Sequence, residues 1–221
     1  MTVTNSFYEL EGDHVDEFQK RYPGPVRPIG PLLQEYFVRG QYLTTPSGQL
    51  AAAELEWLDH RSPGSVIYAS FGSQSFISSS QIIELALGLE ASGKPFLWVL
   101  RFPASDENNP TLDAFCRRTE QQGRIVSGWT DQLAILSHPS VGAFITHCGW
   151  NSTLESISIG VPLICWPLFG DQHFNARFLV DEAKVGFEVV QRDEDRMVTR
   201  DEIKKSVFTN LFLIYMFDLL K

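Results

Sequence analysis

WTDQLAILSHPSVGAFITHCGWNSTLESISIGVPLICWPLFGDQ, residues 129–172, joins a buried-strand pattern to a polar turn and then to a helical pattern. The strand-like run is Val141–Thr146, and the turn that follows it is HCGWNST, residues 147–153. Such a turn directs free backbone N–H groups and the positive end of a helix dipole at an anion. In an open α/β sheet, ligands bind at the carboxyl ends of the strands. The stretch therefore predicts a site for a phosphorylated ligand.

Short β-branched or aromatic runs alternate with helical patterns on both sides of this stretch. Ser78–Ser80 is expected to cap a helix whose apolar stripe is Ile82, Leu85, Ala86 and Leu89. Two further helices are expected over residues 151–158 and 171–184, and a polar loop over 104–110. The other predicted strands are SVIYAS (65–70), FLWVL (96–100), RIVS (124–127), VPLICW (161–166) and GFEVV (186–190), the last closing the sheet. The alternation predicts an α/β fold, a Rossmann-like doubly wound parallel sheet.

Composition describes a globular protein with an acidic surface. The 221 residues carry a net charge of −9, with 43% hydrophobic and 20% charged residues, so broad binding to nucleic acid or anionic membranes is not expected. Cys116, Cys148 and Cys165 lack metal-ligand spacing and are expected to be reduced thiols. The N-terminus lacks a signal-peptide pattern. The apolar run Val207–Leu220 is shorter than the roughly 20 residues of a spanning helix. We expect a cytoplasmic protein without stable membrane insertion.

The 44 residues from Trp129 to Gln172 resemble the signature box of plant secondary-product glycosyltransferases, the family 1 UDP-dependent glycosyltransferases. The core HCGWNSTLES (147–156) and the closing Asp171-Gln172 stand as that family has them, and the length of the box is preserved. The resemblance extends from Asn5 to about Lys205. It implies the C-terminal, donor-binding domain of a two-domain enzyme of the GT-B fold, which transfers a sugar from a UDP-sugar to a small molecule.

The resemblance also implies a domain organisation. Residues 1–50 resemble the end of the family's N-terminal domain and the interdomain linker, and residues 51–206 resemble the donor-binding domain. Residues 207–221 form an atypical apolar C-terminal tail that replaces the family's usual continuation. A truncated gene model, a retained intron or a splice product would each explain both ends.

Each part of a UDP-sugar needs a different partner. Trp129 can stack on uracil, a contact of about 1–3 kcal/mol by analogy with base–aromatic stacking, and Gln132 can bond to the uracil edge. Glu155 lies four residues after Asn151 on one helix face and can accept from the ribose hydroxyls, the role that the family assigns to its position. Without the resemblance, Trp129 would be read as a core or rim residue and Glu155 as a solvated carboxylate.

The diphosphate and the sugar complete the predicted site. His147, Asn151 and Ser152 would meet the diphosphate with Ser73 approaching from a neighbouring loop, although His147 could instead be structural. The family assigns the sugar hydroxyls to Asp171 and Gln172; this glutamine, together with Trp150 in place of arginine, resembles glucose-using members. UDP-glucose is therefore the expected co-substrate, with no cofactor and no metal. The predicted donor-binding residues are Ser73, Trp129, Gln132, His147, Gly149, Trp150, Asn151, Ser152, Glu155, Asp171 and Gln172.

Inverting transfer to the hydroxyl of a flavonoid, phenolic or terpenoid needs a base that takes the acceptor's proton. The family places that base, a histidine, in its N-terminal domain, so we assign no catalytic residue in this chain and expect an acceptor only if such a domain is supplied. The isolated chain is accordingly expected to be inactive. The alternative is a non-catalytic UDP-sugar-binding fragment without turnover. A nicotinamide-dependent Rossmann dehydrogenase is disfavoured because no GxGxxG follows any predicted strand.

Overall fold

The structure, a computed structural model, describes residues 1–33, 51–73, 77–100 and 110–219, with side chains up to Thr209. Two compact units are present, Met1–Thr44 and Thr45–Lys221. Apart from Pro110, the polar loop expected over residues 104–110 lies outside the described residues. Among the described residues, no helix combines the length and apolarity needed to cross a membrane.

The first unit is a small strand–helix–strand arrangement. Strand β1 (Thr2–Thr4) pairs in parallel with β2 (Val26–Pro28), and helix α1 (Tyr8–Arg21) connects them. None of these three elements was predicted from the sequence. The two strands have three residues each and the helix buries no side chain, so neither leaves a clear periodic pattern.

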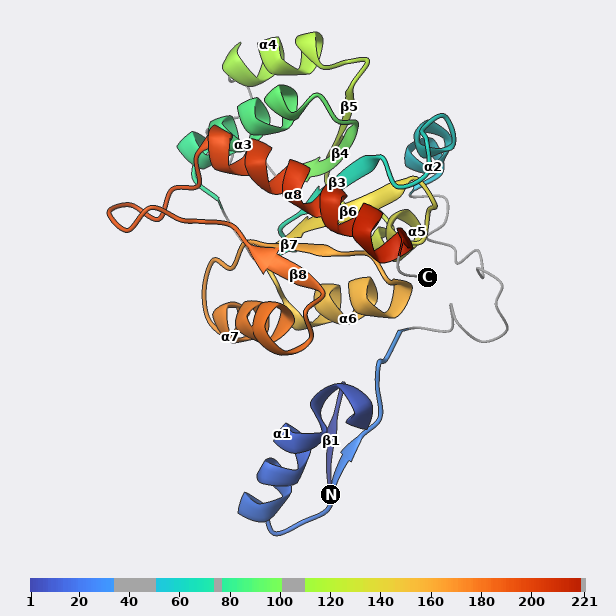
Figure 1. The fold of residues 1–221 in the computed structure, drawn as a ribbon, viewed down its shortest axis with the longest axis vertical. Helices are drawn as coiled ribbons and strands as arrows, with labels where there is room; N and C mark the ends of the chain where they lie inside the picture. Colours follow the sequence, from blue (N-terminus) through green and yellow to red (C-terminus); the bar gives the residue numbers. More distant parts are fainter. Residues whose placement is uncertain (34–50, 74–76, 101–109, 220–221) are drawn as a thin grey trace. The chain divides into compact units, whose positions relative to one another are not determined.

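The second unit contains a six-stranded parallel sheet in the order β5-β4-β3-β6-β7-β8, shown in Figure 1. Its elements are α2 (Ala52–Asp59), β3 (Val66–Ser70), α3 (Ser79–Ser92), β4 (Phe96–Leu100), α4 (Pro110–Arg118), β5 (Gly123–Ser127), α5 (Gln132–Leu136), β6 (Val141–Thr146), α6 (Trp150–Ile159), β7 (Leu163–Cys165), α7 (Gln172–Arg177), a π-helix (Phe178–Glu182), β8 (Gly186–Glu188) and α8 (Arg200–Leu219).

This topology confirms the doubly wound prediction. From β3 the chain proceeds outward to β4 and β5, and then returns to β6 on the other side of β3 before continuing to β7 and β8. The strand order therefore reverses between β3 and β6, and such a switch point is where doubly wound sheets bind ligands. The predicted strands all form, and β8 closes the sheet at one edge. The helix expected over residues 171–184 is instead α7 followed by one π-helical turn.

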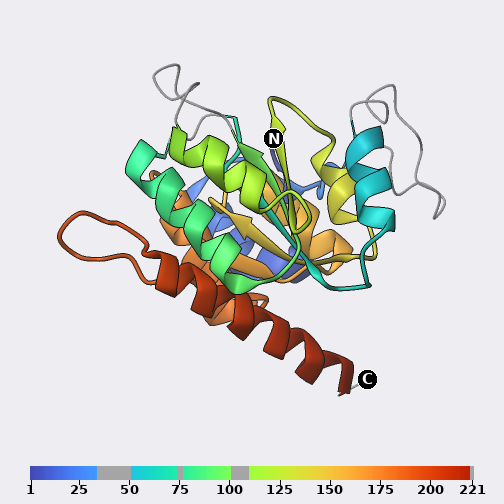
Figure 2. The ribbon, with the colours of Figure 1, turned by 90° about the horizontal axis from the view of Figure 1, so that it is seen from above.

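Helices cover both faces of the sheet, as Figures 1 and 2 show. Along β3, Ile67 and Ala69 point to the face covered by α3, α4 and α8, whereas Val66 and Tyr68 point to the face covered by α2, α5 and α7. The predicted stripe of α3 is buried in the first of these cores, and the Ser78 side chain caps that helix by accepting from the Gln81 N–H.

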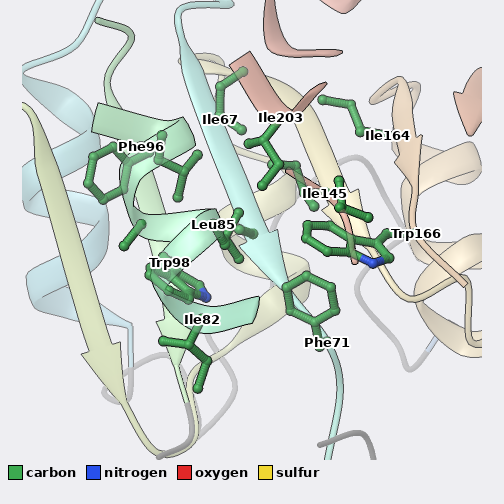
Figure 3. Packing of buried hydrophobic residues seen from close by; sticks show 14 of the residues in the cluster. Ile67, Phe71, Ile82, Leu85, Phe96, Trp98, Ile145, Ile164, Trp166 and Ile203 are labelled. Atoms are coloured by element: carbon green, nitrogen blue, oxygen red, sulfur yellow. The ribbon is translucent and has the colours of Figure 1, made fainter. Parts of the chain in front are cut away.

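The core extends to the carboxyl edge of the sheet. Phe71 follows β3 directly and meets Trp166, which follows β7, in an edge-to-face contact with ring centroids 5.3 Å apart, visible in Figure 3. Both side chains are almost fully buried. Aromatic pairs of this kind stabilise a fold by about 0.5–1.5 kcal/mol beyond the area that they bury.

Candidate functional site

The loops that follow β3, β6 and β7 leave the sheet side by side. Ser70 pairs with Thr146 in the register of β3 and β6, and Thr146 pairs with Cys165 in that of β6 and β7. The segment after Ser70 therefore begins next to His147, the first residue after β6. Because this is the switch point of the sheet, the residues of the predicted box meet where a ligand is expected.

His147 is held in a narrow slot between two glycines. A Cβ on Gly72 would lie 2.8 Å from the His147 Nε2 atom, and a Cβ on Gly149 would lie 2.4 Å from it, so any larger residue at either position would displace the imidazole. Gly72 has a φ of +72°, a conformation that favours glycine. The two glycines are thus required by the position of the ring.

The chemistry of His147 suits an external ligand. Its Nδ1 atom is buried and has no hydrogen-bond partner among the residues that the structure describes. Burial lowers the pKa of the imidazole, and the nearby Asp171 carboxylate partly opposes this shift. A buried polar atom without a partner is rare in native proteins, and a bound group is one way in which such an atom is satisfied.

Helix α6 begins immediately after this slot. Its N-cap, Gly149, offers no capping side chain, so the positive helix end faces the loops directly. Cys148 adopts a φ of +64°, and its turn is held from both sides. The Cys148 N–H donates to the Thr146 hydroxyl at 3.3 Å, and the Asn175 amide of α7 donates to the Cys148 carbonyl at 3.0 Å. Asn175 was not predicted, and nothing in its local pattern distinguishes it.

Three of the predicted residues form one hydrogen-bonded cluster. The Gln132 Nε2 amide donates to the Glu155 carboxylate at 2.7 Å and to the Ser152 hydroxyl at 2.9 Å. Burial raises the pKa of Glu155; the bond from Gln132 lowers it, and the charge of Asp131 raises it further. Gln132 thus contacts Glu155, the residue expected at the ribose. From the sequence, Gln132 was expected only at the uracil edge.

One member of this cluster was missed by the sequence analysis. The Tyr68 hydroxyl lies 3.4 Å from the Gln132 Oε1 atom. Tyr68 stands within a buried strand pattern, so its residue type suggested core packing alone. The signal that could have revealed it is the polar tip of a buried tyrosine, which normally finds a hydrogen-bond partner.

The remaining predicted residues differ in their exposure. Trp129 is 67% exposed, an orientation open to stacking. Asn151 is exposed and Ser152 is buried at the start of α6. Trp150 is half-buried, and its ring centroid lies 6.3 Å from that of Phe178. Ser73 ends the described segment 51–73.

Asp171 and Gln172 begin α7 in contrasting environments. Asp171 is exposed, and its carboxylate accepts from the Asn175 amide at 3.4 Å. Gln172 is only 5% exposed, and its Oε1 atom accepts from the backbone N–H groups of Leu168 and Phe169 at 2.9 and 3.1 Å. The oxygen of Gln172 is therefore committed to the preceding loop, so a ligand would meet its Nε2 amide.

A serine–histidine–aspartate arrangement occurs at the opposite edge of the sheet. The two ring nitrogens of His138 lie 2.8 Å from the Ser140 hydroxyl and 3.1 Å from the Asp59 carboxylate. Ser140 is 1% exposed and could not attack a substrate. The arrangement ties α2 to the turn before β6 and is structural. Within the described part of the chain, no three histidine, cysteine or carboxylate side chains are grouped to hold a metal ion.

Comparison with known proteins gives consistent results. Residues 25–208 match the family described as UDP-glucoronosyl and UDP-glucosyl transferase. UDP-glycosyltransferase 73E1 of Stevia rebaudiana is 42% identical over 217 residues, and scopoletin glucosyltransferase of Nicotiana tabacum is 40% identical over 215 residues. Each match covers 93% of this chain and 44% of the relative.

Solved structures show the same architecture. Phytolacca americana UGT2, complexed with UDP-2fluoro-glucose and pterostilbene, has a TM-score of 0.78 and 36% identity, covering 97% of this chain and 46% of that one. A transferase from Siraitia grosvenorii in complex with UDP has a TM-score of 0.79 and 32% identity, covering 97% and 53%. The chain thus spans less than half the length of the curated relatives described above.

Proposed function

Since the chain belongs to the UDP-glucoronosyl and UDP-glucosyl transferase family, we propose that the carboxyl edge of its sheet binds a UDP-sugar, with UDP-glucose preferred. The observation that carries this proposal is the position of His147 beside the positive end of α6, at the switch point of the sheet. A diphosphate supplies both the hydrogen-bonding oxygens and the negative charge that this position favours.

Different side chains bind different parts of the UDP-sugar. Trp129 stacks on the uracil, and Glu155 together with Gln132 holds the ribose side of the nucleotide. The diphosphate lies against the start of α6, where Gly149 lets the backbone approach closely. Asp171 and the Nε2 amide of Gln172 hold the sugar hydroxyls, and the neutral ring of Trp150 suits an uncharged hexose. His147, Asn151, Ser152 and Ser73 are the residues assigned to the diphosphate.

For the whole enzyme we propose inverting transfer of glucose to the hydroxyl of a small molecule, such as a flavonoid, phenolic or terpenoid. The acceptor oxygen attacks the anomeric carbon and passes its proton to a base, while the bond from that carbon to the diphosphate oxygen breaks. His147 and the α6 dipole stabilise the negative charge that develops on the departing UDP. No residue of this chain is assigned as the base. The proposed compartment of the protein is the cytoplasm.

The proposed organisation follows the family. Residues 1–50 correspond to the end of an N-terminal domain with its linker and residues 51–206 to the donor-binding domain, whereas residues 207–221 are an atypical tail that departs from the family. A second candidate function is UDP-sugar binding without turnover, which the coverage of less than half of the curated relatives favours for the chain alone.

Calorimetric titration of UDP and UDP-glucose into the 221-residue chain tests the proposal. Glu155→Gln keeps the side-chain size but removes the charge that accepts from the ribose, so UDP affinity should fall roughly 5- to 150-fold. Glu56→Gln, on the exposed surface of α2, is the matched control and should bind as the wild type does. A folded chain that binds neither ligand would contradict the proposal.

Turnover separates the two candidates. Release of UDP from UDP-glucose would be followed with a phenolic acceptor, first with the chain alone and then with a histidine-bearing N-terminal domain added. UDP binding without release in the first mixture, followed by release in the second, is the expected result. Binding without release in both would favour the non-catalytic function.

A further inference from the structure

Tyr68 connects the core of the sheet to the proposed nucleotide site. It lies on the central strand β3, is 1% exposed, and stacks on Phe144 of β6 with ring centroids 4.9 Å apart. The ring is therefore fixed by packing. Its hydroxyl reaches the Gln132 Oε1 atom at 3.4 Å, on the first residue of α5, and so touches the cluster of Gln132, Ser152 and Glu155.

The chemistry of the cluster determines which way the Gln132 carboxamide faces. The Glu155 carboxylate can only accept hydrogen bonds, so the amide nitrogen of Gln132 must be the atom that faces it at 2.7 Å. The carboxamide oxygen then faces the opposite way, toward Tyr68. An oxygen needs a donor, and the Tyr68 hydroxyl is the donor that this cluster places there.

The Tyr68 hydroxyl keeps its proton. Burial raises the pKa of the phenol, a hydrogen bond with Ser70 lowers it, and the negative charges of Glu155 and Asp131 raise it further. The net shift is upward, so the hydroxyl stays a donor across the physiological range. Without it, the carboxamide oxygen would lose the donor that this cluster supplies, and the carboxamide would be held at one end only.

We propose that Tyr68 is a positioning residue of the donor site: its hydroxyl holds the Gln132 carboxamide in the orientation that aligns Glu155 and Ser152 for the nucleotide. The inference rests on the proposed function for its ligand, but the orientation itself belongs to the ligand-free chain. Tyr68 acts through Gln132 and does not touch the substrate.

The first test needs no ligand. The titration of the Glu155 carboxyl would be followed by carbon NMR in the wild type, Tyr68→Phe, Gln132→Ala and the double variant. Because the bond from Gln132 lowers the pKa of Glu155, Gln132→Ala should raise that pKa. Tyr68→Phe should raise it in the same direction and add nothing in the double variant. A Glu155 pKa left unmoved by Tyr68→Phe would overturn the proposal.

The second test measures UDP affinity in the same four proteins. Tyr68→Phe should weaken binding roughly 3- to 10-fold in the wild-type background, the effect of one hydrogen bond, and less than about 2-fold in the Gln132→Ala background. An equal loss in both backgrounds would mean that Tyr68 acts through general packing and would overturn the inference. Tyr8→Phe removes a phenol hydroxyl that bonds to Asp16 in the first unit, and should leave affinity unchanged.

The two proposals can fail separately. If the wild-type chain does not bind UDP, the proposed function fails, and the Glu155 titration still decides whether Tyr68 orients Gln132. If UDP binds normally but the double-mutant cycle shows no coupling, the function stands and the positioning role is wrong. Thermal unfolding of each variant confirms that the folded state is compared throughout.

Discussion

His138 and His147 stand at opposite ends of the same strand, β6. His138 precedes the strand, and both of its ring nitrogens have partners in the chain, the Ser140 hydroxyl and the Asp59 carboxylate. His147 follows the strand, and its buried Nδ1 atom has no partner within the described residues. Of these two histidines, the one at the amino edge has both ring nitrogens satisfied within the chain, whereas the one at the carboxyl edge has a ring nitrogen without a partner among the described residues.

The glycines near these ends differ in the same way. Near the amino edge, a Cβ on Gly142 would lie 2.1 Å from the backbone oxygen of Gly64, which cannot move without disturbing the chain. At the carboxyl edge, a Cβ on Gly149 would meet the imidazole of His147. Gly142 is thus needed for backbone packing, and Gly149 is needed for the position of the His147 ring. Residue type alone does not reveal the role of a histidine or glycine; its partners do.

The glycine pair should give the largest effects. Gly142→Ala forces a backbone shift and should lower the free energy of unfolding by about 1–3 kcal/mol or more, measured by urea denaturation. Gly149→Ala should displace His147 and reduce UDP affinity roughly 5- to 150-fold with a smaller loss of stability. If Gly149→Ala bound UDP as tightly as the wild type does, Gly149 would not be needed for binding, and the proposed difference between Gly142 and Gly149 would be wrong.

The histidine pair should separate stability from binding. His138→Ala leaves the buried Ser140 without its partner and should destabilise the fold by about 1–3 kcal/mol while UDP affinity changes little. His147→Ala should weaken UDP binding by about 1.5–3 kcal/mol, the range for a hydrogen bond to a charged group, at little cost in stability. Urea denaturation measures the stability of both variants, and calorimetry measures their UDP affinity. A loss of affinity in His138→Ala and a loss of stability in His147→Ala would contradict the assigned roles.

In Gln172, one side chain has both a structural role and a proposed binding role. Its Oε1 atom accepts from the backbone of the preceding loop, and its Nε2 amide is proposed to bond to the sugar. Gln172→Glu keeps the two acceptor bonds to Leu168 and Phe169 but removes the donor. UDP carries more negative charge on its diphosphate than UDP-glucose does, so repulsion by the new carboxylate weakens UDP more and opposes the expected change in the ratio. Loss of the donor should nevertheless lower the affinity of UDP-glucose relative to UDP, by roughly 3- to 10-fold. An unchanged ratio would contradict the role of Gln172 at the sugar.

The smallest effect concerns pH. Burial holds the pKa of His147 below its usual value of about 6.5, so the unfolded chain binds this proton more readily than the folded chain. Stability should fall as the pH drops below about 6.5 toward the folded pKa, and be unaffected above it. His147→Asn should reduce this loss by less than about 1 kcal/mol between about pH 7 and pH 5.5. An equal pH dependence in the variant, measured by urea denaturation, would exclude His147 as its source.

Most elements of the sheet could be predicted from local patterns. Runs such as Phe96–Leu100 and Val141–Thr146 form strands with the predicted bounds because their apolar residues and flanking turns are contiguous. The short strands of the first unit and the π-helical turn after α7 were missed, since neither carries a distinctive period. In the site, the box placed His147 beside α6, but nothing local indicated that Asn175 would bond to the Cys148 carbonyl, and the polar tip of the buried Tyr68 did not indicate which residue it would meet.

Chain order and residue chemistry were enough to predict a doubly wound sheet with a phosphate-binding turn after β6, because periodicity and turn residues act over a few positions. The tertiary structure alone assigned partners: Tyr68 to Gln132, 64 residues apart, and His138 to Asp59, 79 residues apart. These pairings depend on which strands become neighbours, and a hydrogen bond forms only where folding brings a donor and an acceptor within about 3 Å.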